Sequence, residues 1–270
     1  MEKNINIKRL YQPVQPIIRP AFGHVKYQEF KPDIRLSQYI YCYWELKTEQ
    51  QLEAEFHYRV VADGCMDIYF ELNNPIESYV IGFSKNYTEF PLDTTFHYIG
   101  IRFYPAMFPL LFHINASELT DRYELLELIL PEKAAFIKNH FNPTLDLVTI
   151  QSLLDHFYLN RINQHGVKPD FRFFSAMDHI LKNSGNITIE GDLNTGISSR
   201  QLRRLFAFYV GDSTKTFCKV IRFQNILYRH PQTENKEPNA FLDFGYYDQA
   251  HFIKEFKTMY GDTPKNALKK

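Results

Sequence analysis

The stretch DQAHFIKEFKTMYGDTPK (residues 248–265) repeats an earlier stretch, SSRQLRRLFAFYVGDSTK (residues 198–215), without a gap. The separation is 50 residues, so that Phe206 corresponds to Phe256. In both copies the apolar residues recur at the three- and four-residue spacing of an amphipathic helix. The sequence therefore predicts one short cationic helix that occurs twice, with a fixed length of chain between the copies.

Both copies also carry the residues that begin and end a helix. Ser198 and Asp248 are N-cap types, whose side-chain oxygen accepts a hydrogen bond from an otherwise unpaired backbone N–H. Gly211 and Gly261 can adopt the left-handed backbone conformation that closes a helix. Each copy is therefore expected to form a capped helix of about three turns.

The helix of the first copy separates its apolar residues from its charged ones. Leu202 and Phe206 lie on the apolar face, and the arginines lie on the opposite one. In a helix-turn-helix, the second helix enters the DNA major groove, where an arginine that pairs with guanine contributes about 1–3 kcal/mol of discrimination. Because duplex DNA is periodic and anionic, it is the expected ligand. The expected DNA contacts of this helix are Ser199, Arg200, Arg203 and Arg204.

The second copy presents a chemically softer surface, with Phe252, Phe256 and Met259 packed inward. Glutamine can pair with adenine and isoleucine can contact a thymine methyl group, so this copy is expected to read a different DNA element. Its expected DNA contacts are Gln249, Ala250, His251, Ile253, Lys254 and Lys257.

A third helix is predicted between the copies, over residues 215–230. Sixteen residues at 1.5 Å each give a rod of about 24 Å. With the widths of the flanking units added, the separation approaches the 34–36 Å of one DNA turn. Both copies could then enter successive major grooves on one face of a duplex.

The net charge of the chain is zero, but the charge is divided unevenly along it. Residues 168–270 hold sixteen Lys and Arg against eleven Asp and Glu, whereas residues 1–167 have a net charge of −5. Residues 198–230 hold seven basic residues and one acidic one. This asymmetry is typical of a basic binding module joined to a neutral or acidic domain.

The first half of the chain has the pattern of a β-rich domain. Short runs of β-branched and aromatic residues are separated by turn signals and indicate an antiparallel β-barrel or sandwich. The predicted strands cover residues 39–46, 56–61, 66–72, 78–83 and 96–103. After Pro105 the apolar spacing becomes helical, which predicts amphipathic helices over residues 118–130 and 144–162.

These patterns predict an α+β protein of two domains. Residues 163–170 are polar, contain Gly and Pro, and form the expected linker. The predicted domains are residues 1–165, a β-rich sensor or dimerisation domain with a helical C-terminal part, and residues 166–270, an all-α domain with two helix-turn-helix units. Residues 231–238 are expected to form a loop between those units.

The last hundred or so residues resemble the tandem helix-turn-helix domain of AraC/XylS-type transcription regulators. The residues that carry the resemblance are SSRQLRRLF (198–206), GDSTKTFCKVIRFQNIL (211–227) and FGYYDQAHFIKEFKTMYGDTPK (244–265). The resemblance implies sequence-specific promoter binding by two recognition helices. By position, it places base contacts on Arg200, Arg203 and Arg204 and on Gln249, Ala250, His251 and Lys254.

The chain departs from that pattern at the helix that precedes the first turn. Gly191 and Asp192 occupy the places of a usual Leu-Ala pair, and Phe241 replaces a small residue in the second unit. A glycine inside a helix costs about 0.5–1 kcal/mol relative to alanine, so this supporting helix is expected to be short or frayed.

The N-terminal half resembles the β-rich sensor domain of a subset of these regulators. The segments 42–49, 58–72 and 99–121, with an Arg-Phe-x-Pro element at residues 102–105, carry this likeness. It implies a domain for recognition of a small-molecule effector or for homodimerisation, and it identifies no ligand.

The sequence gives weaker support to other kinds of site, namely a metal site, a disulfide framework and a ligand pocket. Histidines 24, 57, 97 and 113 are scattered without an H-x-H pair, and cysteines 42, 65 and 218 lack a CxxC pair, so no metal and no disulfide framework is expected. No cofactor motif or membrane-length apolar run occurs, and the expected location is the cytoplasm. Asp63, Cys65 and Asp67 could form a functional turn or a plain hairpin tip, and Trp44 with Tyr41, Tyr43 and Tyr58 could line a pocket or fill a core.

Two alternatives to a DNA-binding regulator remain open. The first is an enzyme whose β domain acts on a small molecule, with the helical half as a regulatory part. A bound metal would favour it. The second is an interaction protein in which the DNA-binding face is degenerate and the helices of residues 118–162 mediate assembly. Salt-dependent DNA binding would separate this second alternative from a regulator, because affinity falls as salt rises when bound phosphates release counterions.

Overall fold

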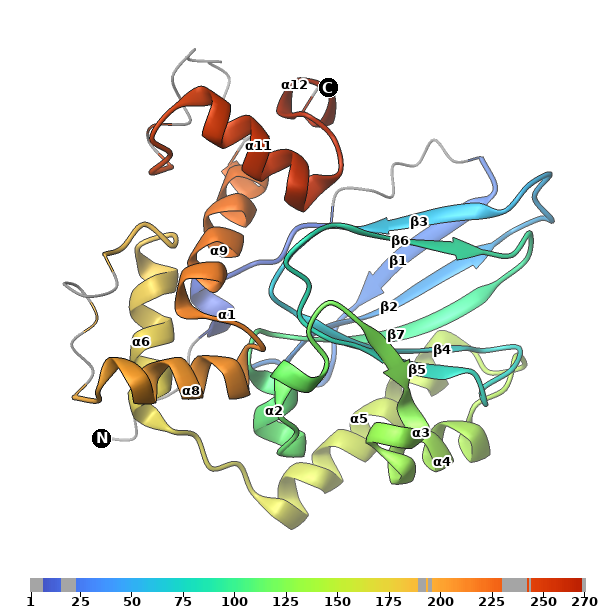
Figure 1. Ribbon diagram of the computed structural model, residues 1–270. Helices are drawn as coiled ribbons and strands as arrows, with labels where there is room; N and C mark the ends of the chain where they lie inside the picture. Colours follow the sequence, from blue (N-terminus) through green and yellow to red (C-terminus); the bar gives the residue numbers. More distant parts are fainter. Residues whose placement is uncertain are drawn as a thin grey trace.

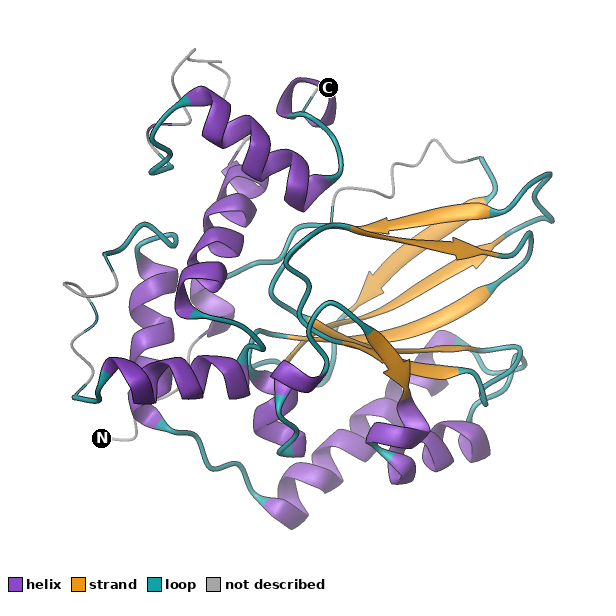
Figure 2. Cartoon of the chain, viewed as in Figure 1, coloured by secondary structure: helices purple, strands orange, loops and turns teal. Residues whose placement is uncertain are grey.

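The computed structural model describes residues 7–15, 23–188, 193, 196–229, 242 and 244–268. Within these residues, the N-terminal half contains a short first helix and eight strands (Figures 1 and 2). The helix is α1 (Ile7–Leu10), and the strands are β1 (Val25–Phe30), β2 (Ile40–Thr48), β3 (Phe56–Val60), β4 (Met66–Glu71), β5 (Ser78–Ile81), β6 (Thr88–Leu92), β7 (His97–Phe103) and β8 (Tyr123–Leu125). The β-rich character expected of this half is confirmed.

Six of the strands form one antiparallel sheet in the order β1-β2-β7-β4-β5-β8, and β3 pairs with β6 in a separate antiparallel ribbon. Figure 2 shows the ribbon beside one face of the larger sheet. The described strands therefore form a sheet with a second, smaller layer. The expectation of an antiparallel sandwich holds, and the alternative of a closed barrel is wrong because the strand order leaves β1 and β8 as unpaired edges.

Side chains alternate between the two faces of the large sheet, as the two-residue period of a strand requires. On β7, Ile99, Ile101 and Phe103 point into the main hydrophobic core. Tyr98 and Arg102, which alternate with them along the strand, point to the opposite face, which lies toward the β3–β6 ribbon. The apolar face thus holds the domain together, and the other face is left for polar and aromatic groups.

Helices cover the apolar face of the sheet (Figure 1). They are α2 (Met107–Phe112), the 3-10 turn η1 (Ala116–Glu118), α3 (Leu126–Ile129), α4 (Pro131–His140) and α5 (Leu147–His165). The predicted helix over residues 144–162 is confirmed as α5, whose N-cap Asp146 accepts a hydrogen bond from the Thr149 N–H. Contacts such as that between the rings of Phe103 and Tyr158, 5.6 Å apart, join α5 to the sheet.

The single helix predicted over residues 118–130 is wrong. This segment forms the end of η1, then strand β8, then the short α3. Asp121 has a left-handed backbone (φ 57°), which interrupts a helix, and β8 adds to the sheet edge by pairing with β5. Backbone pairing with an open sheet edge therefore outweighs the helical spacing of the apolar residues.

The C-terminal half is helical, as predicted. Its described helices are α6 (Phe171–Lys182), α8 (Ser199–Tyr209), α9 (Thr214–Arg229), α11 (Gln249–Tyr260) and α12 (Pro264–Ala267). The helix expected over residues 215–230 is α9. Residues 189–192, Phe241 and the loop expected over residues 231–238 lie outside the described residues, so the departures at Gly191 and Asp192 stay predictions.

The two halves share one hydrophobic core. Buried residues from the sheet, such as Ile101, belong to the same contact cluster as Phe206 of α8 and Phe256 of α11. The first described helix, α1, packs against α6 of the C-terminal half. Helix α5 ends at His165, and Gly166 is its C-cap. The boundary predicted between residues 165 and 166 remains a proposal, while the packing joins the two halves closely.

Candidate functional site

Helix α8 forms as its sequence predicts. The Ser198 hydroxyl accepts a hydrogen bond from the Gln201 N–H at 3.3 Å, and Gly211 follows the helix with φ 106°. Leu202 and Phe206 are buried. The residues predicted to contact DNA are all exposed, namely Ser199, Arg200, Arg203 and Arg204. The helix therefore presents three cationic side chains to solvent from a firmly packed base.

Helix α11 repeats this arrangement. Asp248 accepts a hydrogen bond from the His251 N–H at 2.7 Å, and Gly261 closes the helix with φ 91°. Phe256 and Met259 are buried, as predicted. The predicted contact residues are again exposed, namely Gln249, Ala250, His251, Ile253, Lys254 and Lys257.

Helix α9 joins the two exposed helices, which lie at its opposite ends (Figure 1). Its sixteen residues correspond to about 24 Å. The Nζ of Lys219 on α9 lies 2.8 Å from the Oε2 of Glu255 on α11, and the Phe223 and Phe256 rings are 5.3 Å apart. An ion pair and an aromatic contact thus fix α11 against the rod.

The β-rich half contacts the segment that follows α8. The Thr120 hydroxyl donates a hydrogen bond to the Gly211 carbonyl at 2.7 Å, and the Nζ of Lys85 lies 3.5 Å from an Asp212 carboxylate oxygen. A Cβ at Gly211 would lie 2.6 Å from the Thr120 hydroxyl oxygen, so this close approach requires glycine. The end of α8 is therefore held by the loops of the sheet domain.

The equivalent end of α11 is held in the same way. The Ala62 N–H donates to the Met259 carbonyl at 3.2 Å, and the Tyr87 N–H donates to the Thr258 carbonyl at 3.1 Å. The two repeated helix ends, which correspond by sequence, thus contact loops of one domain: the end of α8 contacts Lys85 and Thr120, and the end of α11 contacts Ala62 and Tyr87. We call two of these loops, residues 61–65 and 82–87, the coupling loops.

A buried glutamine joins the first coupling loop to α9. The Gln224 side chain donates to the Ala62 carbonyl at 2.8 Å and accepts from the Val14 N–H at 2.7 Å. A Cβ at Gly64 would lie 3.4 Å from the Phe217 ring of α9. The loop therefore lies in van der Waals contact with the rod that carries both exposed helices.

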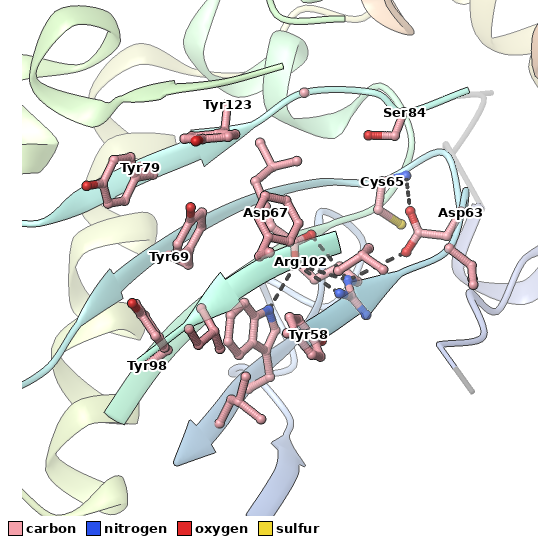
Figure 3. Close-up of a pocket in the computed structure, with 18 of the residues that line it drawn as sticks. Tyr58, Asp63, Cys65, Asp67, Tyr69, Tyr79, Ser84, Tyr98, Arg102 and Tyr123 are labelled. Atoms are coloured by element: carbon pink, nitrogen blue, oxygen red, sulfur yellow. Dashed lines mark hydrogen bonds and ion pairs between the residues drawn. The ribbon is translucent and has the colours of Figure 1, made fainter. Parts of the chain in front are cut away.

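The same loops line a cavity on their other side. The cavity has a volume of about 220 Å³ and lies between the large sheet and the β3–β6 ribbon. Val61, Asp63 and Cys65 of the first coupling loop and Gly82 and Ser84 of the second contribute to its wall. Figure 3 shows Cys65, Asp63 and Ser84 together at one end.

Aromatic side chains form the other end of the cavity. Tyr69 and Tyr79 are cross-strand partners with ring centroids 5.3 Å apart, and Tyr98 lies edge-on to Tyr69 at 5.9 Å (Figure 3). The floor is Trp44, which crosses the sheet above Gly100, where a Cβ would lie 1.9 Å from the indole ring. Gly100 is thus the residue that lets this wide ring lie flat on the sheet.

A buried ion pair occupies the polar end. Arg102 lies with its Nη2 3.0 Å from an Asp67 oxygen, and its Nε is 3.7 Å from Asp63. The Trp44 Nε1–H donates to Asp67 at 2.9 Å. Burial raises the pKa of Asp67 above its ordinary value, although the charge of Arg102 opposes that shift. The Asp67 carboxylate is therefore held in place by two donors of different kinds.

Sequence reasoning located part of this cavity. Trp44 and Tyr58 line it, as in the pocket alternative, whereas Tyr43 points to the other face and donates a hydrogen bond to Asp155 of α5. Asp63, Cys65 and Asp67, the suspected turn, also line it. Sequence reasoning missed the tyrosines of β4, β5 and β7, although their alternation with buried residues on each strand was a usable signal.

In the part of the chain that the structure describes, no group of three or more His, Cys, Asp or Glu side chains could hold a metal ion. Cys42, Cys65 and Cys218 are free thiols and are buried. Among the described residues, no helix has the length and apolar content needed to cross a membrane.

Two family models match the chain. Residues 194–270 match a helix-turn-helix domain, and residues 28–124 match a domain of unknown function, DUF6597. The first match covers α8, α9 and α11, and the second covers most of the sheet and both coupling loops. No curated protein matches the chain.

Solved structures of ToxT from Vibrio cholerae are similar to the chain over most of its length. Wild-type ToxT with a bound unsaturated fatty acid, from strain SCE256, is 10% identical, with a TM-score of 0.44, 93% of this chain covered and 97% of that chain. A second ToxT structure, at 1.65 Å resolution, is 10% identical, with a TM-score of 0.40 and coverage of 91% and 98%.

The conclusion rests on the agreement between the helix-turn-helix match and the geometry of the C-terminal half. Two capped helices with exposed polar faces lie at the ends of one rod, within the residues that the helix-turn-helix model covers. Residues 194–270 match a helix-turn-helix domain family, and this match and the geometry together support an AraC-like DNA-binding regulator of transcription.

Proposed function

We propose that this regulator reads a promoter with α8 and α11 and that a small molecule in the sheet-domain cavity controls the reading. One observation carries the proposal. The coupling loops, residues 61–65 and 82–87, line the cavity on one side and contact the ends of both recognition helices on the other. A ligand that shifts these loops would change how the two helices are held relative to each other.

The roles proposed for the two helices follow from their side chains. Arg200, Arg203 and Arg204 of α8 have the geometry to pair with guanine or with phosphate oxygens. On α11, Gln249 suits adenine, and Ile253 suits a thymine methyl group. Ala250, His251 and Lys254 complete the proposed base-reading surface of α11, and Ser199 and Lys257 add proposed contacts to the DNA phosphates.

The coupling acts through the relative placement of the two helices. Two helices bind successive grooves together only when their separation and direction match the duplex. Phe83 and Lys85 of the second coupling loop lie against Gly211 and Asp212, which follow α8, and Ala62 of the first coupling loop bonds to Met259 of α11. A small displacement of the loops would therefore change the affinity for the paired sites more than the affinity for either site alone.

Selection of binding sites from random duplex DNA by the purified protein tests the proposal directly. It is expected to return two short elements, the first guanine-containing, about one helical turn apart. Affinity for the selected site is expected to fall steeply as salt rises, because bound phosphates release counterions. A failure to enrich any sequence, with no salt-dependent binding, would instead favour an interaction protein with a degenerate DNA face.

A matched pair of variants tests base reading. Arg203→Ala should weaken the selected site by about 1–3 kcal/mol while leaving random DNA much less affected, because it removes a base contact. Lys257→Ala should weaken binding to the selected site and to random DNA about equally, because it removes a phosphate contact. It should also reduce the slope of log affinity against log salt concentration by about 1. Affinities measured at several salt concentrations check both, and equal losses in the two variants would contradict base reading by Arg203.

The remaining parts of the proposal follow from this role. We place the protein in the cytoplasm, where bacterial promoters are accessible, and assign it no catalytic activity. Homodimerisation is proposed through α5, on which Val148 is 75% exposed.

A further inference from the structure

We propose that the cavity binds a small organic cation, with its positive group among the tyrosines and its flat apolar body over Trp44. The inference deepens the proposed control by a small molecule and rests on it for its biological meaning. The binding itself is a separate claim, because occupancy of the cavity can be measured without DNA.

The tyrosine side chains provide a binding site for a cation. The rings of Tyr69 and Tyr79 stack at 22°, whereas Tyr98 meets Tyr69 at 63° and Tyr123 meets Tyr79 at 75°, so the outer two rings form corners with the stacked pair. Burial raises the pKa of Tyr98 to about 12, so its ring stays uncharged at neutral pH. Neutral aromatic rings around one space are the arrangement that recognises ammonium groups in proteins.

A carboxylate lies at the same end. Glu77 lines the cavity, is exposed, and precedes Tyr79 on the same side of the strand. Burial is the largest cause of the raised pKa of Tyr98 and of Tyr79; Glu71 and then Glu77 raise the pKa of Tyr98 further, and Glu77 raises that of Tyr79. Glu77 would therefore attract a cation to the mouth of the cavity, and the cation would then contact the tyrosine rings.

The interior favours positive charge as well. Asp63, Asp67 and Glu77 line the cavity against one cation among the lining residues, Arg102. Even with Asp67 protonated, two carboxylates would still oppose one guanidinium. The cavity wall therefore has a net negative charge in either state.

An anionic ligand is disfavoured for the same reason. Arg102 is already paired, since its Nε and Nη2 both bond to Asp67 and Asp63 lies 3.7 Å away. An incoming carboxylate would have to displace one of these buried partners and leave it without a counterion, which is strongly unfavourable. Arg102 thus acts as a structural part of the wall and not as an anion receptor.

The size and shape of the cavity limit the ligand further. Its volume of about 220 Å³ lies below the roughly 300–1,000 Å³ of drug-sized sites, so one ring and a short side arm fit. Leu46, Val60 and Leu92 provide apolar walls above and beside the indole. An arylalkyl ammonium compound matches each of these surfaces.

Three compounds that differ only in their polar end test the inference, namely 3-phenylpropylammonium, 3-phenylpropanol and 3-phenylpropanoate. The full-length protein reports occupancy through Trp44, its single tryptophan, which lies in the cavity wall. The ammonium compound is expected to bind about five- to thirtyfold more tightly than the alcohol, and the carboxylate more weakly than both. Titration calorimetry checks that the fluorescence change reports binding.

Two variant pairs locate the cation. Tyr79→Leu should remove most of the preference for ammonium over alcohol, whereas Tyr79→Phe, which keeps the ring, should retain it. Glu77→Gln should weaken the ammonium compound several-fold and leave the alcohol unchanged. Glu132→Gln makes the same chemical change at an exposed position of α4, away from the cavity, and should have no effect.

The outcomes separate the ligand class from the proposed function. Tightest binding of the carboxylate, equal binding of all three compounds, or no binding of the ammonium compound at millimolar concentration would overturn the inference. Tight ammonium binding that leaves DNA affinity unchanged would support the inference and overturn control of DNA reading through the cavity. DNA affinity that responds to the carboxylate compound alone would overturn the inference of a cationic ligand and support control of DNA reading through the cavity.

Discussion

Lys133 is a buried side chain whose desolvation destabilises the folded protein. Its amine is buried among aromatic rings of α4 and α5, 3.8 Å from the centroid of Phe157 and 4.3 Å from that of Tyr158, and has no hydrogen-bond partner. Burial lowers the pKa of Lys133 well below its ordinary value. Because the amine has no hydrogen-bond partner, its ring contacts are what offset the loss of hydration.

Lys133→Met is therefore expected to stabilise the protein by about 1 kcal/mol or more at neutral pH. The folded chain binds the Lys133 proton more weakly than the unfolded chain, so stability falls as pH decreases from about 10.4 toward the lowered pKa. The variant should lose this part of the pH dependence. Urea denaturation between about pH 7 and pH 10 checks both effects. A variant that is less stable at pH 7 would show that the contacts between the cation and the rings outweigh desolvation.

Gly100 shows which residues of the cavity a sequence cannot reveal. Trp44 and Gly100 are 56 residues apart in the chain and lie side by side because β2 pairs with β7 in one register. Each looks ordinary alone, a strand tryptophan and a strand glycine. Only the register shows that the missing side chain of one makes room for the ring of the other.

The helices of the C-terminal half were predictable because their signals are local. N-cap, apolar spacing and closing glycine all lie within about fifteen residues, and the repeat gave each copy an independent check. Strand β6 was missed because Pro91 and polar neighbours hide it, and it forms by pairing with β3. Strand β8 was missed because its pairing partner, β5, lies more than forty residues earlier.

The N-caps of the two recognition helices should differ in strength. Asp248 accepts from the His251 N–H at 2.7 Å and carries a charge that favours a helix N-terminus, whereas Ser198 accepts at 3.3 Å and is neutral. Asp248→Ala is expected to cost about 1–2 kcal/mol of stability, and Ser198→Ala about 0.5–1 kcal/mol. Thermal or urea denaturation of both variants checks the order. The reverse order would mean that the tertiary packing of α11, and not its cap, sets where the helix begins.

At the scale of the whole molecule, the sheet and the DNA-binding helices share one core, and Gln224 links them. This side chain is 1% exposed, and its amide bonds to Ala62 in a coupling loop and to Val14 near the N-terminus. The sequence places these residues far apart, so the contact between the halves could not be predicted. A shared core predicts that the two halves unfold together.

Gln224→Ala should break that cooperativity. In the unaltered protein, Trp44 fluorescence reports the sheet and far-ultraviolet circular dichroism reports mainly the helices, and the two denaturation midpoints should coincide. The substitution leaves the buried Ala62 carbonyl and Val14 N–H unpaired, which costs about 1–3 kcal/mol each and falls on the contact between the halves. The helical transition should then precede the Trp44 transition, whereas Gln201→Ala, at an exposed position of α8, should leave them coincident. Separate midpoints in the unaltered protein would mean that the coupling loops dock too weakly to carry a signal from the cavity to both recognition helices.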